Sequence, residues 1–187
     1  MGLFDQMTDL LGGRAPLERF ANDQAQFDDP SSPDHERWNH MVSAAPEEDV
    51  QEALTQAARH VDSQEYYDHI TPGVRGTNPL GQLGGGTLAM LASRLLGNLT
   101  HSGGFDLSRL QQLIPGLHTT DPQRMDPQEV ADVANYTRQH HPDAFGRTAA
   151  QVGRQEPGVL QQLLGNKALM LAAAGLATRL LDSRARR

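Results

Sequence analysis

The residues whose types and spacing best suit chemistry form a short acidic stripe with one histidine. Asp62, Glu65 and His69 are spaced i, i+3 and i+7, and Asp68 is adjacent to the histidine. On a helix this spacing places the three side chains on one face, as in helical sites where carboxylates and an imidazole bind a metal ion. The same spacing also occurs on plain solvated helix faces, which is the interpretation that we favour. A metal site at these three residues is therefore a hypothesis, and it would make the protein a metal-dependent enzyme.

Two further histidine pairs have spacings that do not suit a shared metal ion. His35 and His40 flank a sequence close to the H-E-x-x-H motif but are one residue too far apart, so their imidazoles diverge by about 140° around a helix. His140 and His141 are adjacent at a predicted helix C-terminus, where cationic side chains are favourable. We expect neither pair to bind metal, and we expect no resident cofactor.

A glycine-rich stretch, residues 81–86, directly precedes a predicted helix. Backbone amides at such a position bind phosphate in some proteins. Here no strand is predicted before the stretch, and it has neither a terminal Gly-Lys-Ser/Thr nor a G-x-G-x-x-G register. A connector, or glycines that allow close helix approach, is the favoured interpretation. The chain also lacks G-x-S-x-G and S-x-x-K motifs and any cysteine nucleophile, so its sequence supports no particular enzymatic reaction.

Acidic and basic residues are divided unevenly along the chain. The protein has 187 residues, a formal net charge of −7 and no cysteine. Residues 1–70 hold 15 acidic and 4 basic residues, a net charge of −11, whereas residues 71–187 hold 8 acidic and 12 basic residues, a net charge of +4. The two parts therefore attract each other, within one chain or between chains. The alternative is a solvated acidic face with an ordinary basic remainder.

Composition also argues against nucleic acid and against a membrane span. The basic C-terminus could neutralise phosphates, but the net negative charge and the absence of interleaved aromatic residues oppose it. The apolar run 168–181 would rise about 21 Å, which is less than the roughly 30 Å hydrocarbon core of a bilayer, so a buried helix is predicted. The N-terminus does not resemble a signal peptide, and a cysteine-free chain fits a reducing compartment. We therefore expect a cytoplasmic protein.

The hydrophobic pattern predicts an all-α fold. Apolar residues recur at helical spacing, and no long run alternates with the period of two that predicts a sheet. Asp126 and Glu129 predict a capping box at one helix start, and Asp106 is expected to cap another helix. The helical period of residues 34–44 is expected to turn Trp38, Met41 and Val42 toward the core. The predicted helices span residues 2–11, 15–27, 34–44, 46–62, 87–98, 106–114, 126–141, 142–152, 157–164 and 166–183.

An imperfect internal duplication relates residues 46–96 to residues 126–181. Val50 and His60 precede their counterparts Val130 and His140 by 80 positions. The duplication predicts two related helix–loop–helix units, packed as a helical bundle in which each buries the other's apolar face. Each unit ends in a helix with small residues, near 86–93 and 172–175. We expect these two helices to pack together around a pseudo-twofold axis, within the chain or across a dimer.

Residues 1–33 are expected to form an acidic amphipathic arm and linker outside a core domain of residues 34–187. The predicted helix 2–11 has an apolar face that suits docking as a helix in a groove. Its anchors are Leu3, Phe4, Met7, Leu10 and Leu11. Deleting residues 1–33 is expected to leave the core folded and to abolish assembly. The alternative is that the same helix lies on a membrane surface, although Asp5 and Asp9 would be repelled by anionic lipid.

The first residues of the chain carry a resemblance to a known family. Met1-Gly2-Leu3-Phe4-Asp5-Gln6, followed by Leu10-Leu11-Gly12-Gly13, resembles the start of the YidB-like family of small bacterial helical proteins. The segment Pro127-Gln128-Glu129-Val130 is similar to that family's helical openings. The resemblance covers a small part of the chain and implies a bacterial, all-helical protein, with no established activity to carry over. The acidic linker and the long central loop depart from the family pattern.

These observations give three functional interpretations in order of preference. The first is a non-enzymatic bacterial helical scaffold or interaction protein that contacts itself, as a homo-oligomer, or another protein. The second is a peripheral membrane or envelope-stress protein that uses the helix at residues 2–11. The third is the metal-dependent enzyme with its site at Asp62, Glu65 and His69.

Overall fold

The computed structural model describes residues 14–22, 26–27, 31–71, 79–102 and 106–185, and it confirms the all-α prediction. Within these ranges the regular structure is helical, and no strand is present. The elements are α2 (Arg14–Ala21), α3 (Pro33–Ala44), α4 (Glu47–His60), α5 (Ser63–Ile70), the 3₁₀ turn η1 (Leu80–Gln82), α6 (Gly85–His101), α7 (Leu107–Leu113), α8 (Pro127–His140), α9 (Pro142–Gln155) and α10 (Pro157–Ala185).

Local sequence signals set the helix ends. The Asp126 carboxylate accepts a hydrogen bond from the Glu129 backbone N–H, and the Glu129 carboxylate accepts one from the Asp126 N–H, so the predicted capping box is confirmed. Asp106 caps α7 through the Ser108 N–H, as the sequence predicts. α10 is interrupted at Gly165, which has φ of 71° and ψ of 164°. Glycine adopts this left-handed region without steric cost, so the predicted boundary between helices 157–164 and 166–183 falls at that residue.

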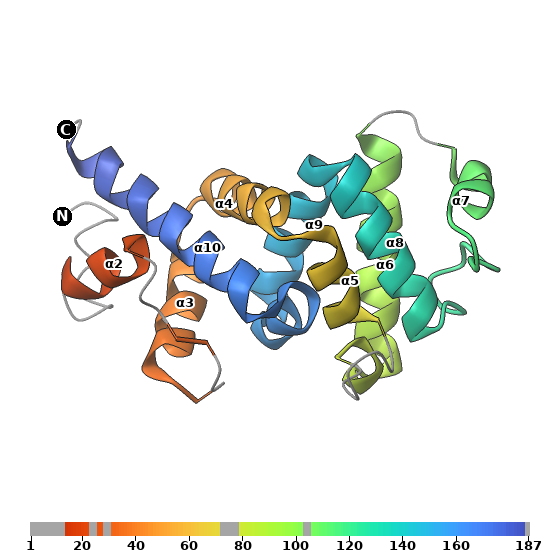
Figure 1. Cartoon of the computed structure of the whole chain (residues 1–187), viewed down its shortest axis with the longest axis horizontal. Helices are drawn as coiled ribbons and strands as arrows, with labels where there is room; N and C mark the ends of the chain where they lie inside the picture. The colour runs from red at the N-terminus through yellow and green to blue at the C-terminus, as the bar shows by residue number, and fades with distance from the viewer. Residues whose placement is uncertain (1–13, 23–25, 28–30, 72–78, 103–105, 186–187) are drawn as a thin grey trace.

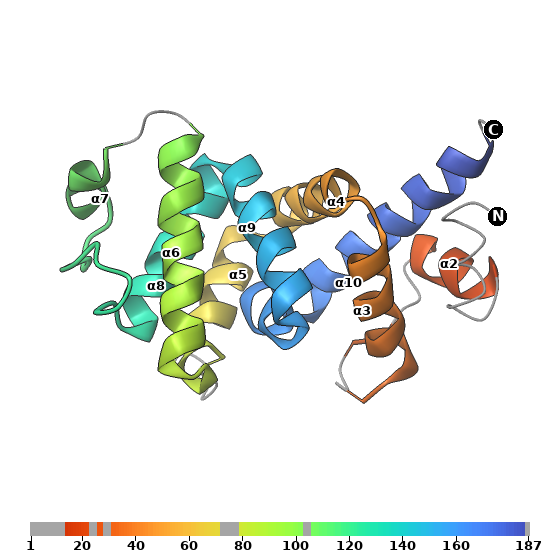
Figure 2. The same cartoon turned by 180° about the vertical axis from the view of Figure 1, so that it is seen from behind.

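The helices are arranged along one long axis of the molecule (Figure 1, Figure 2). α2 and α3 lie at one end, and α6, α7 and α8 lie toward the other. Between them α4 packs against α9 and α10, while α6 packs against α8 and α9. Buried apolar side chains from all of these helices form one continuous core, in which leucine and alanine predominate.

The two predicted repeat units interlock. The order α4, α5, α6 in residues 46–96 and just beyond is repeated by α8, α9, α10. The first helix of each unit packs on the third helix of the other, α4 on α10 and α8 on α6. Val50 and Val130 are both fully buried, and His60 and His140 are each the last residue of the first helix. Each unit thus covers the other's apolar face, while the duplication itself stays a prediction.

The expected pairing of the two small-residue helices within the chain is wrong. α6 and α10 form no extensive contact in the part of the chain that the structure describes, and they lie apart in Figure 1. α10 instead uses its small residues against α4, where a Cβ on Gly175 would lie 3.8 Å from the Ala53 Cβ. The reason is that α4 and α9 occupy the space between the two helices. Pairing across a dimer stays a prediction.

Part of the predicted arm belongs to the core. α2 packs along α10, and Leu17, Phe20 and Phe27 are buried in the same cluster as the rest of the chain. The buried Asp34 carboxylate fastens this segment, because it lies 2.8 Å from the Arg19 guanidinium and accepts a hydrogen bond from the Gln26 N–H. Deleting residues 1–33 would therefore remove core side chains. Residues 1–13, 23–25 and 28–30 of the predicted arm lie outside the described residues, and the five predicted anchors of helix 2–11 are among them.

Searched for membrane spans, the described residues contain no helix of the length and apolarity needed to cross a bilayer. The apolar run 168–181 lies within α10, where Ala172, Ala173 and Leu176 are fully buried against neighbouring helices. This agrees with the prediction of a buried helix.

Candidate functional site

The three residues of the hypothetical metal site are not brought together. Asp62 precedes α5 and acts as its N-cap, because its carboxylate accepts hydrogen bonds from the Gln64 and Glu65 backbone N–H groups at 2.8 and 3.1 Å. These two hydrogen bonds hold the pKa of Asp62 below its usual value. The Glu65 carboxylate pairs with the Lys167 ammonium at 2.7 Å. Across the described residues, no group of three or more His, Asp or Glu side chains could hold a metal ion.

His69 contacts the backbone of α10 at its interruption. Its Nε2 lies 3.2 Å from the Gln162 carbonyl oxygen, and its ring packs under Gly165, where an added Cβ would approach it to 3.2 Å. The imidazole Nε2–H thus donates to a backbone carbonyl close to the break. Burial lowers the pKa of His69, and hydrogen bonds to the Gln161 and Gln162 carbonyls oppose that shift.

The lowered pKa of His69 predicts acid sensitivity. The unfolded chain binds a proton at His69 more readily than the folded chain, so stability is full above the unfolded pKa of about 6.5 and falls as the pH drops below it. The charged side chains around it are Glu65, Asp68 and Lys167. We expect His69→Gln to flatten the fall in urea-unfolding free energy between pH 7.5 and 5.5. A slope equal to that of the original chain would show that other groups cause it.

Glu65 and His69 do share the wall of a pocket between α5 and the break in α10. This pocket has a volume of about 430 Å³. Its lining residues are Val61, Glu65, Tyr66, Asp68, His69, Leu164, Gly165, Asn166 and Lys167. The ionic groups that border it are already paired, since Glu65 binds Lys167 and Asp68 accepts from the Gln64 amide at 2.7 Å. The pocket is therefore best explained as a consequence of the bend in α10.

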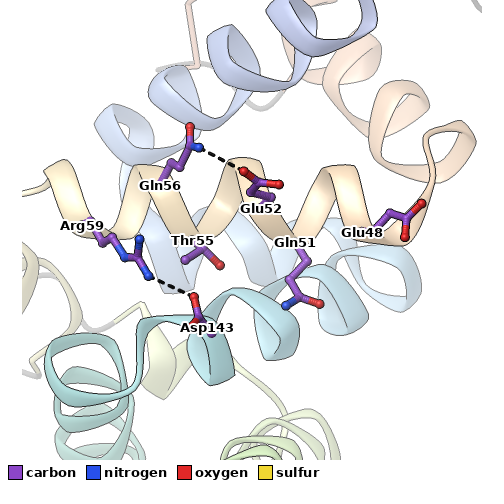
Figure 3. A pocket seen from close by; sticks show the side chains of 7 residues that line it. All are labelled: Glu48, Gln51, Glu52, Thr55, Gln56, Arg59 and Asp143. Carbon is purple, nitrogen blue, oxygen red and sulfur yellow. Dashed lines mark hydrogen bonds and ion pairs between the residues drawn. The ribbon is translucent and has the colours of Figure 1, made fainter. Parts of the chain in front are cut away.

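A second pocket, shown in Figure 3, lies between α4 and α9 and has a volume of about 350 Å³. All seven of its lining residues are polar, namely Glu48, Gln51, Glu52, Thr55, Gln56, Arg59 and Asp143. Arg59 and Asp143 form an ion pair at 3.0 Å across its mouth, and both side chains are more than half exposed. Such a pair contributes little to stability in water. The pocket offers solvated charge without an apolar anchor among its lining residues.

The other residues that drew attention in the sequence have structural roles. His35 is buried with its ring edge-on to Phe27 at a centroid distance of 5.5 Å, whereas His40 is exposed. A Cβ added to Gly84, Gly85 or Gly86 would meet no atom within 4 Å. Close helix approach therefore does not explain these three glycines, which lie at the start of α6.

A groove on the described surface, between α7 and α8, combines an exposed apolar side chain with aromatic and polar groups. We call it the α7–α8 groove. It has a volume of about 370 Å³ and is lined by Tyr67, Leu113, Ile114, Pro115, Asp132, Asn135, Tyr136, Gln139 and His140. The five α8 residues are spaced i, i+3, i+4, i+7 and i+8, which is one face of a helix. One wall is thus a helical stripe of aromatic, amide and imidazole groups, and the other is the apolar end of α7.

Glu129 fixes the segment that carries the α7 wall. Its Oε1 accepts hydrogen bonds from the His118 and Thr119 backbone N–H groups at 2.8 and 3.3 Å, and its Oε2 accepts from the Asp126 N–H. Glu129 is only 5% exposed, so these bonds form away from bulk water. Ile114 and Leu117 insert into the core just before this segment. The wall of the groove is therefore preformed.

Asp132 is the carboxylic acid that lines the groove. Burial raises the pKa of Asp132, and the nearby Asp126 and Glu129 carboxylates raise it further, whereas hydrogen bonds from Gln128 and Tyr67 oppose the shift. Above it, the Tyr136 ring lies 4.6 Å from the His140 ring. The groove thus combines side-chain amides and an imidazole with an apolar wall and two tyrosines, and tyrosine is enriched at protein interfaces.

Leu113 is the apolar anchor at the rim. In the described part of the chain it is the only large hydrophobic side chain that is exposed, with 49% of its surface accessible. Sequence reasoning placed it on a short helix but did not single it out. The only local signal was the last of three leucines spaced i, i+3 and i+6, at Leu107, Leu110 and Leu113. The groove itself depends on how three helices pack.

Comparisons with known proteins leave the site to be judged on its geometry. Neither a protein-family model, a curated protein nor a solved structure matches this chain.

Proposed function

We propose that this protein is a non-enzymatic bacterial helical scaffold that acts through contacts between copies of itself, with the α7–α8 groove as a contact surface. The observation that carries the proposal is the exposed Leu113 beside the aromatic and amide stripe of α8. Tyrosine is enriched at protein–protein interfaces, and covering the exposed leucine beside it would remove apolar surface from water. In the two other pockets, basic and acidic lining residues already pair with each other, Arg59 with Asp143 and Lys167 with Glu65.

Charge distribution supports contacts between copies. The net charge of −11 on residues 1–70 and +4 on residues 71–187 lets opposite parts of two chains attract each other. Some of this attraction is used within the chain, since Arg179 pairs with Asp49 at 3.6 Å and also with Glu52.

Sedimentation equilibrium of the intact chain and two variants tests the proposal. We expect the intact chain to exceed the monomer mass of 20.4 kDa. Leu113→Glu should reduce it to a monomer, because the substitution removes the anchor and places a charge in the groove. The matched control is Gln112→Glu, which adds the same charge at the exposed neighbour of Leu113 outside the groove lining and should leave assembly intact. Equal masses for the intact chain and Leu113→Glu would overturn the proposal.

A further inference from the structure

We infer that the occupant of the α7–α8 groove is the segment of residues 1–13 of a second copy, so that the copies join end to end. This inference rests on the proposed function and names the partner segment for its contact surface. It is argued from the length of the apolar stripe on the segment and that of the α8 face of the groove, from the positions of the two ends of the molecule and from the polar groups on each side.

The two stripes match in length and periodicity. The predicted anchors run from Leu3 to Leu11, and the α8 face of the groove runs from Asp132 to His140. Each stripe covers eight helical steps, about 12 Å along a helix axis. Apolar residues at i, i+1, i+4, i+7 and i+8 on one helix suit ridge-and-groove packing against such a face. Leu113, Ile114 and Pro115 would then flank the incoming helix from the other side.

The positions of the two ends of the molecule assign the contact to two copies. Residue 13 adjoins α2, and α2 and α7 lie at opposite ends of the long axis in both views (Figure 1, Figure 2). Helices α10, α9 and α8 lie between them. Packed helices are spaced about 8–10 Å apart, so three of them span roughly 25–30 Å. The predicted helix 2–11 is only about 15 Å long, and two residues connect it to α2, so it does not reach the groove of its own chain.

Polar groups on the two partners are also compatible. The predicted helix 2–11 carries Asp5 and Asp9 on its polar side. The rim of the groove offers the side-chain amides of Asn135 and Gln139 and the imidazole of His140, which donate hydrogen bonds to carboxylates. The Asp132 carboxylate faces hydrogen-bond donors of its own, Gln128 at 3.0 Å and Tyr67, which limits its repulsion of an acidic partner.

If the segment of one copy binds the groove of another, a copy without the segment should still bind a copy whose groove is altered. A chain lacking residues 1–13 keeps the groove, and a full chain with Leu113→Glu keeps the N-terminal segment. We expect each to be a monomer alone and an equimolar mixture to give a one-to-one complex of about twice the monomer mass, measured by light scattering after size exclusion. Circular dichroism melting of each variant checks that it is folded. Two variants of the segment are compared. Leu10→Glu places a charge on its apolar side and should abolish assembly. The control, Thr8→Glu, places the same charge on its polar side and should leave assembly intact.

The outcomes separate this inference from the proposed function. If Leu113→Glu abolishes assembly and deletion of residues 1–13 does not, the groove is a contact surface with another occupant, and the inference fails alone. If the deletion abolishes assembly and Leu113→Glu does not, the segment docks elsewhere, and both fail. If both variants are monomers but their mixture stays monomeric, the segment does not bind the groove. The intact chain could instead float with phosphatidylglycerol vesicles while the chain lacking residues 1–13 does not, with the same mass for both chains in the absence of vesicles. That result would overturn the inference and assign the segment to a membrane surface.

The absence of cysteine allows a direct test of proximity. The chain contains no cysteine, so a Met7→Cys chain, with its thiol on the apolar side of the segment, and a Gln139→Cys chain each carry one thiol. We expect mild oxidation of their mixture to give a mixed disulfide dimer in higher yield than a mixture of Met7→Cys with Gln161→Cys, which places the thiol on α10. Equal yields would contradict docking of the segment in the groove.

Discussion

Replacing Arg138 with methionine is expected to lower the free energy of unfolding by about 3 kcal/mol, because buried acceptors of a charged donor lose their partner. The Arg138 guanidinium, on α8, donates to the carbonyl oxygens of Ala58 at 2.8 Å and Val61 at 3.1 Å, and to the Ser63 hydroxyl at 2.9 Å. It also lies over the Tyr66 ring, 4.6 Å from the ring centre. One side chain thus pairs the last carbonyls of α4 and joins them to the start of α5.

The expected loss in the free energy of unfolding already allows for one stabilising effect of the substitution. Burial lowers the pKa of Arg138, which reflects the cost of desolvating its charge, and methionine would remove that cost. The side chain is only 5% exposed, so water cannot replace it at the freed carbonyls. Methionine keeps much of the volume, which makes the hydrogen bonds the main difference.

Urea unfolding followed by circular dichroism measures the effect. Arg138→Lys should lose less than Arg138→Met, because one ammonium can serve some but not all of the acceptors that the planar guanidinium serves. The matched control is Arg124→Met at an exposed position, which should change stability by less than about 0.5 kcal/mol. A stability of Arg138→Met within that same limit would show that the hydrogen bonds of Arg138 contribute nothing net.

The second large effect is expected at the crossing of α4 and α9. A Cβ at Gly146 would lie 2.9 Å from the Gln51 carbonyl oxygen, in contact with backbone that cannot rotate away, and it would overlap the Thr55 hydroxyl. Gly146→Ala should therefore destabilise by about 3 kcal/mol, at the upper end for an inserted methyl group in a packed core. The same closeness of the two helices buries the Thr55 hydroxyl without a hydrogen-bond partner in the described structure.

Two further variants make this prediction specific. Thr55→Ala removes the nearer of the two obstacles, so the double variant Gly146→Ala, Thr55→Ala should recover at least about 1 kcal/mol relative to the sum of the single effects. Gly97→Ala, in α6, is the matched control, because its Cβ would meet no atom within 4 Å. Alanine there should stabilise the helix by about 0.5–1 kcal/mol. Equal effects of alanine at Gly146 and Gly97 would refute the close crossing.

Much of the fold could be predicted because its determinants are local. The 3.6-residue period placed Trp38, Met41 and Val42 on a buried face, and the structure confirms all three. Hydrogen bonds between neighbouring residues set where a helix begins, so the caps at Asp106 and at Asp126 with Glu129 could be predicted from a few positions each. The boundary near residue 165 falls at a glycine and could also be predicted locally. These features need no knowledge of the rest of the chain.

The candidate sites were harder to predict because they depend on where helices begin and how they pack. The i, i+3, i+7 argument assumed that Asp62 lies within a helix, whereas α5 begins at Ser63 and Asp62 caps it. One residue of difference at a helix start separates the Asp62 carboxylate from the stripe of Glu65 and His69. The α7–α8 groove draws on three helices, and Arg138 reaches a carbonyl 80 residues earlier in the chain.

The sequence by itself therefore determined the helical class, most helix ends and the apolar face of each helix, because period and capping act over a few residues. Only the tertiary structure decided which faces meet. It placed α10 on α4 and α6 on α8, where the sequence suggested α6 on α10. Leucine and alanine faces of similar size are nearly interchangeable in hydrophobic energy. The choice among them rests on close contacts such as Gly146 at Thr55 and on buried bonds such as those of Arg138, which join residues far apart in the chain.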